Sequence, residues 1–475
     1  MPVLFAVLVA FVSLTVEAPG DWPQFRGVNG SGVAAPGSLP ASLQAGESLA
    51  WSMAVPFGRS SPVVFGDRIL LTASESDRLS TLAYSRSTGK LLWRHDVKRM
   101  QSSERVERLN DPASPTPAVD ASGVYVFFPD VGLVSLDLRG RERWRLPLGP
   151  FWTAYGMASS PIVVDGLVIQ ACDQQKESFL IAVDTRSGRV RWKVERPDMR
   201  EGWYTPMVLP QRNRPGHRML IVPGSARIEA LDVTTGTRLW AIPGSGAENL
   251  GVPVADAGHV YVNVRGFPAP TFESWEVLLA RYDANTDGRI SREEVKGNNI
   301  YFEQFNYIDV DRDGSFSQAE WTTMRNMGVG NFGLIALRLG DQAATPSDVV
   351  WRVERNLPYV PAPVLYKGII YMVKSGGIIT AIDASTGAQL KETRATGALG
   401  PYFASPVAGD DKVYFASADG TVTVLKAGPE LAVLSVNDFG EEIYSTPALV
   451  DGAVIVRTRS HLMTFRSGGS QATAR

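Results

Sequence analysis

The stretch Ala182-Val-Asp184-Thr-Arg-Ser-Gly188-Arg-Val-Arg-Trp192 decides the fold, because it holds a hairpin turn and the strand that follows it. The side chains of Asp184 and Ser187 can bond to the local backbone and Gly188 can take a positive φ, which is typical of a tight turn. Related stretches recur at Ser87–Trp93, Asp232–Trp240 and Asp383–Gly387. The recurrence predicts a repeated β unit, with the tryptophan packed between neighbouring units.

A second repeated feature is a strand that begins at a proline. Eight such starts can be aligned: Ser61-Pro62, Thr116-Pro117, Ser160-Pro161, Thr205-Pro206, Val252-Pro253, Ala362-Pro363, Ser405-Pro406 and Thr446-Pro447. Where the repeat is uninterrupted, the spacing is roughly 40 residues, which is the period of a four-stranded propeller blade. The sequence therefore predicts an all-β protein, an eight-bladed β-propeller.

The last repeat lacks one strand. Residues from Tyr444 to Phe465 supply three strands and then run into a polar tail. The stretch Glu47–Val55 has the pattern of the missing fourth strand. Since pairing of the two termini would remove exposed sheet edges, we expect the N-terminal strand to close the ring.

Two of these repeats, Ala182–Trp192 and Ala230–Trp240, resemble the tryptophan-docking motif of pyrroloquinoline-quinone (PQQ) propellers. The opening Asp21-Trp22-Pro23-Gln24-Phe25-Arg26-Gly27 is similar to the start of many exported bacterial PQQ-like repeat proteins. The resemblance implies a fold like that of the outer-membrane assembly lipoproteins, which are scaffolds for partner proteins. It covers the chain after the N-terminal segment, apart from an interruption at 267–331.

The interruption contains two acidic loops, residues 283–294 and 309–320. Each has oxygen-bearing side chains at loop positions 1, 3, 5, 9 and 12 and glycine at position 6, which is the EF-hand arrangement for calcium. The expected ligands, with backbone carbonyls at position 7, are Asp283, Asn285, Asp287, Arg289, Ser291 and Glu294 in the first loop and Asp309, Asp311, Asp313, Ser315, Ser317 and Glu320 in the second. We expect two structural calcium ions, bound more tightly in the second loop because it has one more carboxylate.

The interruption has a defined place in the repeat. Blade five begins with strands near Val252–Asp256 and His259–Arg265, and its pattern resumes at Asn331–Leu337. An amphipathic helix near Phe272–Tyr282 leads into the first loop. The EF-hand pair is therefore expected between the second and third strands. That connection lies on the face where loops enter the first strands, which we call the funnel face and where propellers usually bind small ligands.

Nine residues just ahead of the first strands are candidates for ligand binding at the funnel. They are Arg59, Asn110, Trp152, Tyr155, Trp203, Tyr204, Tyr359, Tyr402 and Tyr444. Aromatic rings at a concave mouth can stack on planar or sugar-like ligands. The alternative is that they pack the loops against the neighbouring blade.

Composition and charge exclude several classes of protein. The 475 residues carry a formal charge of -2, without the basic excess that nucleic acids or anionic membranes require. Cys172 is the only cysteine, so the chain has no internal disulfide, no multi-cysteine metal site and no c-type haem motif. We expect Cys172 to be buried in a strand.

The N-terminal run of residues 1–18 is apolar but too short to span a bilayer comfortably, and it ends in small residues. We interpret it as a secretory signal peptide; an uncleaved anchor is the alternative, because the run lacks Lys and Arg. Export without disulfides indicates a bacterial periplasmic or extracellular protein. The predicted organisation is a signal peptide (1–18), the first part of the propeller (19–266), the EF-hand pair (267–331), the second part of the propeller (332–466) and a polar tail (467–475).

We expect a calcium-binding, exported propeller that acts as a non-catalytic binding or scaffold module, with a protein, small-molecule or glycan ligand at the funnel face. One alternative is a PQQ-dependent oxidoreductase of alcohols or sugars; another is a polysaccharide-binding or polysaccharide-cleaving propeller. The resemblance implies that the oxidoreductase would hold the quinone and a calcium ion in the funnel and use an aspartate base. Three acids border the funnel without a matching motif: Glu201, Glu248 and Glu441.

Overall fold

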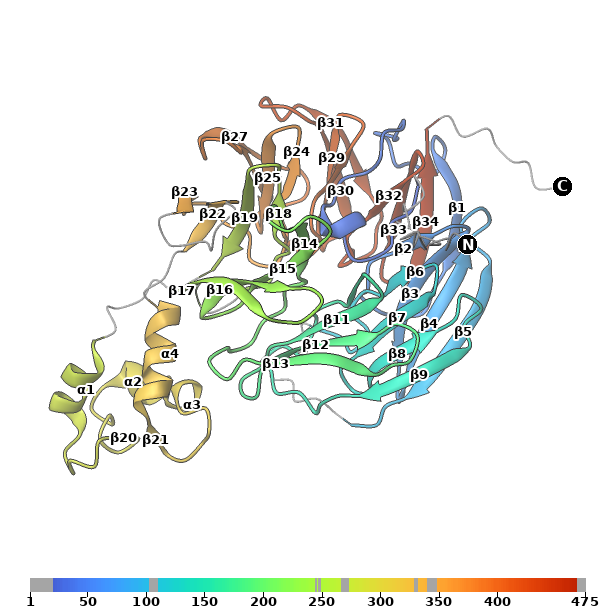
Figure 1. The fold of residues 1–475 in the computed structure, drawn as a ribbon. Coiled ribbons are helices and arrows are strands. Elements are labelled where there is room, and N and C mark those ends of the chain that lie inside the picture. The colour runs from blue at the N-terminus through green and yellow to red at the C-terminus, as the bar shows by residue number, and fades with distance from the viewer. Residues whose placement is uncertain are drawn as a thin grey trace, which may run out of the picture.

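The structure is a computed structural model, and it describes residues 20–101, 110–243, 246, 249–265, 273–328, 332–339 and 348–467. Its strands form eight four-stranded antiparallel sheets arranged around a central axis (Figure 1). This confirms the predicted eight-bladed propeller. The expected signal peptide, residues 1–18, lies outside the described residues.

The first four blades follow one another without interruption. Blade one is β2 (Val63–Phe65), β3 (Arg68–Glu75), β4 (Arg78–Ser85) and β5 (Leu91–Lys98); blade two is β6 (Ala118–Asp120), β7 (Gly123–Phe128), β8 (Gly132–Leu136) and β9 (Glu142–Pro147). Blade three is β10 (Ile162–Val164), β11 (Leu167–Cys172), β12 (Phe179–Asp184) and β13 (Val190–Glu195); blade four is β14 (Met207–Pro210), β15 (Arg218–Pro223), β16 (Arg227–Asp232) and β17 (Arg238–Pro243).

The other four blades include the interrupted one and the closing one. Blade five is β18 (Val254–Ala255), β19 (His259–Val264), β22 (Gly333–Arg338) and β23 (Val349–Val353); blade six is β24 (Val364–Tyr366), β25 (Ile369–Lys374), β26 (Ile378–Asp383) and β27 (Gln389–Arg394). Blade seven is β28 (Val407–Gly409), β29 (Lys412–Ala416), β30 (Thr421–Lys426) and β31 (Val433–Asp438); blade eight is β32 (Ala448–Val450), β33 (Ala453–Arg457), β34 (His461–Arg466) and β1 (Leu49–Ala54).

The burial of the strands follows from the stacking of blades. Every residue of β7 and β11 is buried, because a middle strand packs against a neighbouring blade on both faces. In an outer strand such as β5 most residues are exposed, with half-buried or buried residues between them. Cys172 lies in β11 and is buried, as expected.

The recurrent tryptophans join consecutive blades. Trp144, in β9, donates from Nε1 to the carbonyl oxygen of Thr185 at 3.0 Å, in the turn that contains Gly188. A Cβ atom added at Gly188 would lie 2.8 Å from the Trp144 ring, so this position must be glycine. Trp192 repeats the contact on the next blade, donating to the Val233 carbonyl at 2.9 Å. The predicted packing of tryptophan between blades is confirmed.

The ring closes as expected. Strand β1 pairs antiparallel with β34, with Trp51 opposite Thr464 and Met53 opposite Leu462. Trp51 then donates to the Arg86 carbonyl of blade one at 3.1 Å. The N-terminal strand therefore completes blade eight and also carries the tryptophan contact to blade one.

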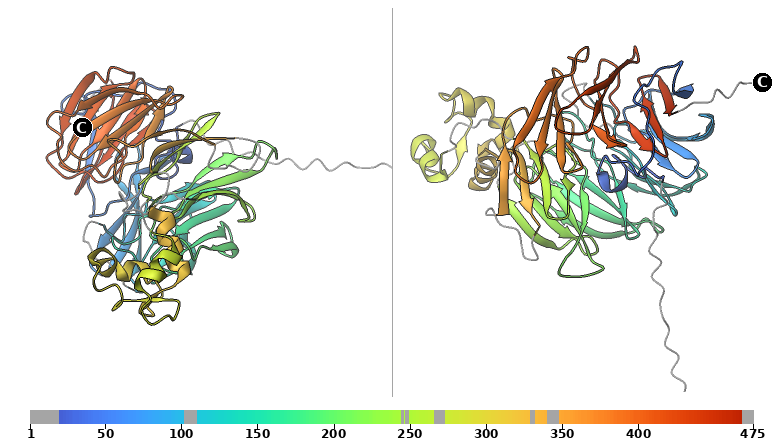
Figure 2. Two further views of the ribbon diagram at one scale, coloured as in Figure 1. Left: turned by 90° about the vertical axis from the view of Figure 1, so that its left-hand side faces the viewer. Right: turned by 90° about the horizontal axis from the view of Figure 1, so that it is seen from above.

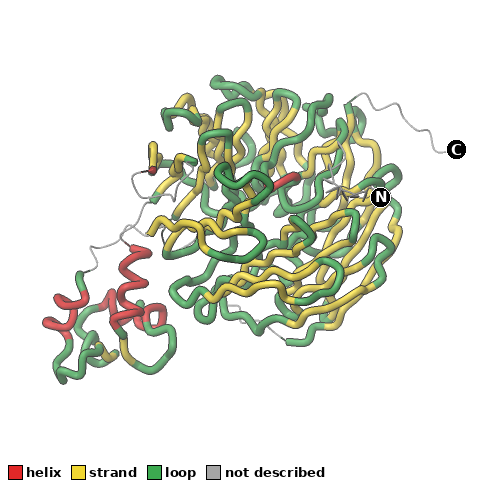
Figure 3. Tube along the Cα trace, viewed as in Figure 1, coloured by secondary structure: helices red, strands yellow, loops and turns green. Residues whose placement is uncertain are grey.

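The four α-helices of the described residues gather outside the ring, in a helical insert that we define as residues 273–328 (Figures 2 and 3). It stands between β19 and β22, the second and third strands of blade five, and comprises α1 (Trp275–Tyr282), β20 (Ile290–Ser291), α2 (Asn299–Glu303), α3 (Phe305–Ile308), β21 (Ser315–Phe316) and α4 (Gln318–Gly328). Ile290 pairs with Phe316, and the insert has its own apolar core. Within the described ranges, no helix has the length and apolarity needed to cross a membrane.

Candidate functional site

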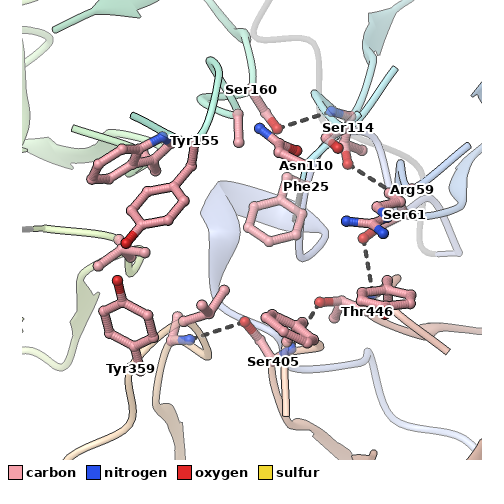
Figure 4. Close-up of a pocket in the computed structure, with 18 residues that line it drawn as sticks. Phe25, Arg59, Ser61, Asn110, Ser114, Tyr155, Ser160, Tyr359, Ser405 and Thr446 are labelled. Atoms are coloured by element: carbon pink, nitrogen blue, oxygen red, sulfur yellow. Dashed lines mark hydrogen bonds between the residues drawn. The ribbon is translucent and has the colours of Figure 1, made fainter. Parts of the chain in front are cut away.

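The inner end of the funnel is built on a chain of hydroxyl groups that links neighbouring blades. The Ser or Thr ahead of each proline accepts a hydrogen bond from the equivalent backbone N–H of the preceding blade. Five of the bonds are drawn in Figure 4: Ser61 N to Thr116 Oγ1 (3.0 Å), Thr116 N to Ser160 Oγ (3.0 Å), Ala362 N to Ser405 Oγ (3.0 Å), Ser405 N to Thr446 Oγ1 (3.0 Å) and Thr446 N to Ser61 Oγ (3.0 Å). A sixth joins Ser160 N to Thr205 Oγ1 (3.2 Å). The chain is interrupted at blades five and six, where Val252 and Ala362 have no hydroxyl.

The N-terminal segment crosses the axis and forms the floor of the funnel, which the sequence did not predict. Phe25 projects into the centre of the site (Figure 4). The next residue, Arg26, is fully buried and donates to the carbonyl oxygens of Gly30 at 3.0 Å, Ala362 at 3.1 Å and Pro363 at 2.6 Å. Burial lowers the pKa of Arg26 to about 9. Arg26 thus ties the segment to blade six, where the hydroxyl chain is interrupted.

Above this floor lies a cavity of about 180 Å³. Six of the nine expected residues line it: Arg59, Asn110, Tyr155, Trp203, Tyr359 and Tyr444. Phe25 and Phe403 also line it, and the sequence had not marked them as candidates. Aromatic rings and hydroxyl groups therefore make up most of the wall.

The aromatic wall is held by stacking and by hydrogen bonds. The Arg59 guanidinium lies 4.1 Å from the centre of the Tyr444 ring, which stacks in turn on Phe403 at 5.1 Å. On the other side, Tyr155 meets Trp203 edge-on at 5.5 Å. Asn110 Nδ2 donates to the Gly156 carbonyl at 3.1 Å. These contacts fix the rings before any ligand arrives.

Three expected funnel residues lie elsewhere. Tyr402 is buried and donates to the Ala398 carbonyl at 2.8 Å, and burial raises the pKa of its phenol. Tyr204 is fully buried and donates to Asp173 at 2.6 Å. Trp152 faces the helical insert, where the Arg312 guanidinium lies 4.4 Å from its ring centre. Position ahead of a first strand did not distinguish these three, because neighbouring side chains in one loop point to different sides.

The acids near the funnel do not line the cavity in the described part of the chain. Glu201 is buried and accepts from the Ala154 N–H at 3.0 Å. Burial opposes the ionisation of Glu441, but hydrogen bonds from Thr458, Ser460 and His461 prevail and lower its pKa to about 2. Glu248 lies outside the described residues. Among the described lining residues the only side-chain amide is that of Asn110, which already donates to backbone carbonyls.

The two acidic loops of the insert turn their carboxylates inward. Glu294 accepts from the N–H groups of Ala284 at 3.0 Å and Ser291 at 2.7 Å. Glu320 does the same in the second loop, from Val310 at 2.8 Å and Ser317 at 2.9 Å. Each loop is thereby wrapped around the last acid of its own sequence.

The second loop gathers its oxygens most closely. Asp309, Asp311 and Asp313 each place one carboxylate oxygen within 4.8 Å of the others. Burial raises the pKa of Asp309, and the neighbouring charges of Glu320, Asp313 and Asp311 raise it further. Mutual repulsion of this kind favours a cation with oxygen ligands. Gly314 has φ +90° at the sharp turn of the loop, which suits glycine.

The remaining expected ligands lie along the same two loops. They are Asp283, Asn285, Asp287, Arg289 and Ser291 in the first loop and Ser315 and Ser317 in the second. Arg289 also joins the loops, because its guanidinium donates to Ser315 Oγ at 2.5 Å and pairs with Asp313.

With this geometry in view, the family of the chain follows from sequence comparison. A family profile described as outer membrane protein assembly factor BamB matches residues 33–242 and 213–471. The chain belongs to this family. Among curated proteins, a serine/threonine-protein kinase AfsK of Streptomyces griseus is 29% identical over 181 residues, which is 37% of this chain and 20% of the kinase. The match thus spans about a fifth of the length of that relative.

Solved structures share the fold of this BamB-family chain. BamB from Moraxella catarrhalis superposes with a TM-score of 0.55 at 13% identity, covering 88% of this chain and 99% of that one. A europium-containing methanol dehydrogenase superposes with a TM-score of 0.61 at 12% identity, covering 94% of this chain and 98% of that one. A quinohemoprotein alcohol dehydrogenase from Comamonas testosteroni superposes with a TM-score of 0.60 at 14% identity, covering 97% of this chain and 82% of that one. Identities this low establish the fold alone.

Proposed function

We propose that this BamB-family propeller is a non-catalytic binding or scaffold module whose helical insert is an EF-hand pair that binds two calcium ions. The observation that carries the first part is the wall of the funnel. Its described residues are aromatic rings, hydroxyls, small or aliphatic side chains, Arg59 and Asn110, and most of the hydroxyls already link the blades. Such a wall can hold an apolar or planar group but offers no described acid or base for catalysis.

The same wall does not suit a quinone dehydrogenase. That chemistry needs Glu, Asn or Asp oxygens to hold a calcium ion beside the quinone, and an aspartate to take a proton. Among the described lining residues there is no carboxylate, and Phe25 takes up the centre of the site. Although dehydrogenases share the fold, the residues of this funnel therefore do not fit PQQ.

Calcium binding is supported by the donors in the two loops. Both offer carboxylate, amide and carbonyl oxygens at EF-hand spacing, which suits a hard cation with several oxygen ligands. The loops also pair through Ile290 and Phe316, as two EF-hands do when they share a core. We infer that calcium holds the insert in shape.

Export is the third part of the proposal. It is supported by the apolar run at residues 1–18 and by a family whose description names outer membrane assembly. The periplasm or the cell exterior would keep even weak calcium sites filled. Cell fractionation of the full-length chain tests this; recovery in the cytosol with residues 1–18 intact would contradict it.

One purified sample tests the two competing functions. Calorimetric titration with calcium should give two binding events, and supplying PQQ with calcium should give no dye reduction with alcohols or sugars. Sustained turnover that is lost on changing an acid near the funnel would overturn the scaffold proposal. A glycan array, with Trp203→Ala as the variant, tests the remaining polysaccharide-binding alternative.

A further inference from the structure

A second, smaller site lies where the helical insert meets the propeller. The cavity there has a volume of about 10 Å³. Its propeller side consists of Trp152, Gln175, Lys176 and Arg200, and its insert side of Asn306, Tyr307, Val310 and Arg312. We call this set of residues the seam. Three of its members are cations, and none of its described members is an acid.

Arg200 is the decisive residue of the seam, because it is buried and no carboxylate of the described residues forms an ion pair with it. Arg200 is only 4% exposed to solvent. Its Nη1 donates to the Met199 carbonyl at 3.3 Å and to the Pro197 carbonyl at 3.4 Å, both long. Among the described residues its Nε has no hydrogen-bond partner, and no carboxylate forms an ion pair with it.

The neighbouring Arg196 is also buried, but carboxylates balance its charge. It is fully buried and makes two hydrogen bonds of 2.9 Å to Asp173, and it also pairs with Glu229. Burial of a charge is costly unless it is paired and hydrogen-bonded. Burial lowers the pKa of Arg200, although electrostatic interactions with Tyr307, Glu320 and Asp198 act in the opposite direction. Within the part of the chain that the structure describes, the charge of Arg200 therefore has no ion pair of the kind that Arg196 has.

The other two cations surround the same cavity. Lys176 Nζ lies 4.8 Å from the centre of the Trp152 ring, and the Arg312 guanidinium lies 4.4 Å from it. Trp152 thus contacts a cation from the propeller and a cation from the insert, and both line the same cavity as Arg200. Because like charges repel, an anion in this cavity would offset the repulsion among the three cations as well as pair with Arg200.

We propose that the seam is an oxyanion-binding site, in which a carboxylate or phosphate-type group bridges the propeller and the insert through Arg200, Lys176 and Arg312. Its volume admits one oxygen of such a group, since about 10–15 Å³ holds a single water-sized atom. Guanidinium groups present a fork of donors that matches an oxyanion. An occupied seam ties the insert to blades three and four.

The test measures the thermal midpoint of the full-length protein as sodium sulfate, sodium acetate or sodium chloride is titrated in. The total ionic strength is the same in every sample. Sulfate stands in for phosphate, which would precipitate calcium. We expect a saturable rise of the midpoint of the wild-type protein in sulfate. Arg200→Gln should weaken the apparent affinity for sulfate by about tenfold or more, because a charge-assisted bond is lost. Arg186→Gln, at an exposed hairpin turn, is the matched control and should behave like wild type.

Further measurements identify the class of anion and show whether a lost response comes from misfolding of a variant. A larger rise in acetate than in sulfate assigns the site to carboxylates, a rise in sulfate alone assigns it to tetrahedral oxyanions, and equal rises show that it accepts either kind of oxyanion. Arg200→Lys should keep part of the response, since it retains the charge without the fork. A response in chloride alone, no saturable response, or equal responses of Arg200→Gln and wild type would overturn the proposal. Titrations with and without calcium separate this result from that of the calcium loops.

Discussion

The carboxylate of Glu441 accepts hydrogen bonds from Thr458 at 2.5 Å, Ser460 at 2.7 Å and His461 at 3.0 Å, at the turn that leads into β34. Its pKa falls from an ordinary 4.5 to about 2 in the folded protein. The ionised form therefore stabilises the fold. That contribution is complete above pH 4.5 and is lost as the pH falls through about 2.

Glu441→Gln should lower the free energy of unfolding at neutral pH by about 1 kcal/mol, a value reduced for solvent screening because the side chain is partly exposed. The difference in thermal midpoint between variant and wild type should become smaller as the pH falls from 4.5 to 2. Glu442→Gln is the control, because Glu442 makes only an exposed ion pair with Arg459. A difference that persists at pH 2 would show that Glu441 acts by packing.

At the scale of elements, the hairpin of blade three tests the tryptophan contact. Gly188 has φ +70° and would place a Cβ atom 2.8 Å from Trp144, whereas Gly216 has φ +84° and no atom within 4 Å of that position. Gly188→Ala should cost about 2–4 kcal/mol, from backbone strain and overpacking, and Gly216→Ala only about 1 kcal/mol. Thermal unfolding of both variants measures the difference. Equal losses would mean that the tryptophan adjusts freely.

The two acidic loops, which we propose bind calcium, give a second prediction at this scale. Glu294→Gln and Glu320→Gln each remove the last acid of one loop, and each should abolish one binding event or weaken it by about two orders of magnitude. The event lost in Glu320→Gln should be the tighter one. Glu293→Gln, an exposed neighbour in the first loop, should leave both events unchanged. Calorimetry of the three variants checks this, and two unaltered events in Glu320→Gln would contradict the assignment.

The elements that could be predicted are those that repeat. Turns such as Asp184–Gly188 and the proline-led strands carry their signal within a few residues, so the blades and the closing strand could be inferred from sequence. The contact of Arg26 with the Ala362 carbonyl joins residues 336 positions apart, and no periodicity links them. For the same reason Phe25 at the funnel and Arg200 at the seam became visible only in the structure.

At the scale of the whole molecule, the N-terminal segment ties the ring together from its centre. Trp22 pairs with Val64 in blade one, the Asn29 amide bonds to the backbone of Val208 in blade four, and Val33 pairs with Ala408 in blade seven. The same segment continues into β1, which completes blade eight. Its contacts therefore span the ring in a way that no single blade does.

The helical insert, unlike the N-terminal segment, has an apolar core of its own. Its apolar core includes residues such as Leu278, Phe305 and Trp321 and is separate from the cores of the blades. The strands on either side of it, β19 and β22, are already paired, with Val264 opposite Gly333. A short hairpin loop can therefore replace the insert without moving either strand.

These two relations predict opposite results from two deletions. Replacing residues 266–331 by a short glycine-containing turn should leave the strand content and the cooperative thermal unfolding of the propeller intact, while calcium binding disappears. Removing residues 1–54 should abolish cooperative unfolding, because blade eight loses its outer strand and the centre loses Arg26. Circular dichroism and calorimetry of both variants test this. If excision of the insert unfolds the ring, its contact at Trp152 and Arg200 stabilises the propeller itself.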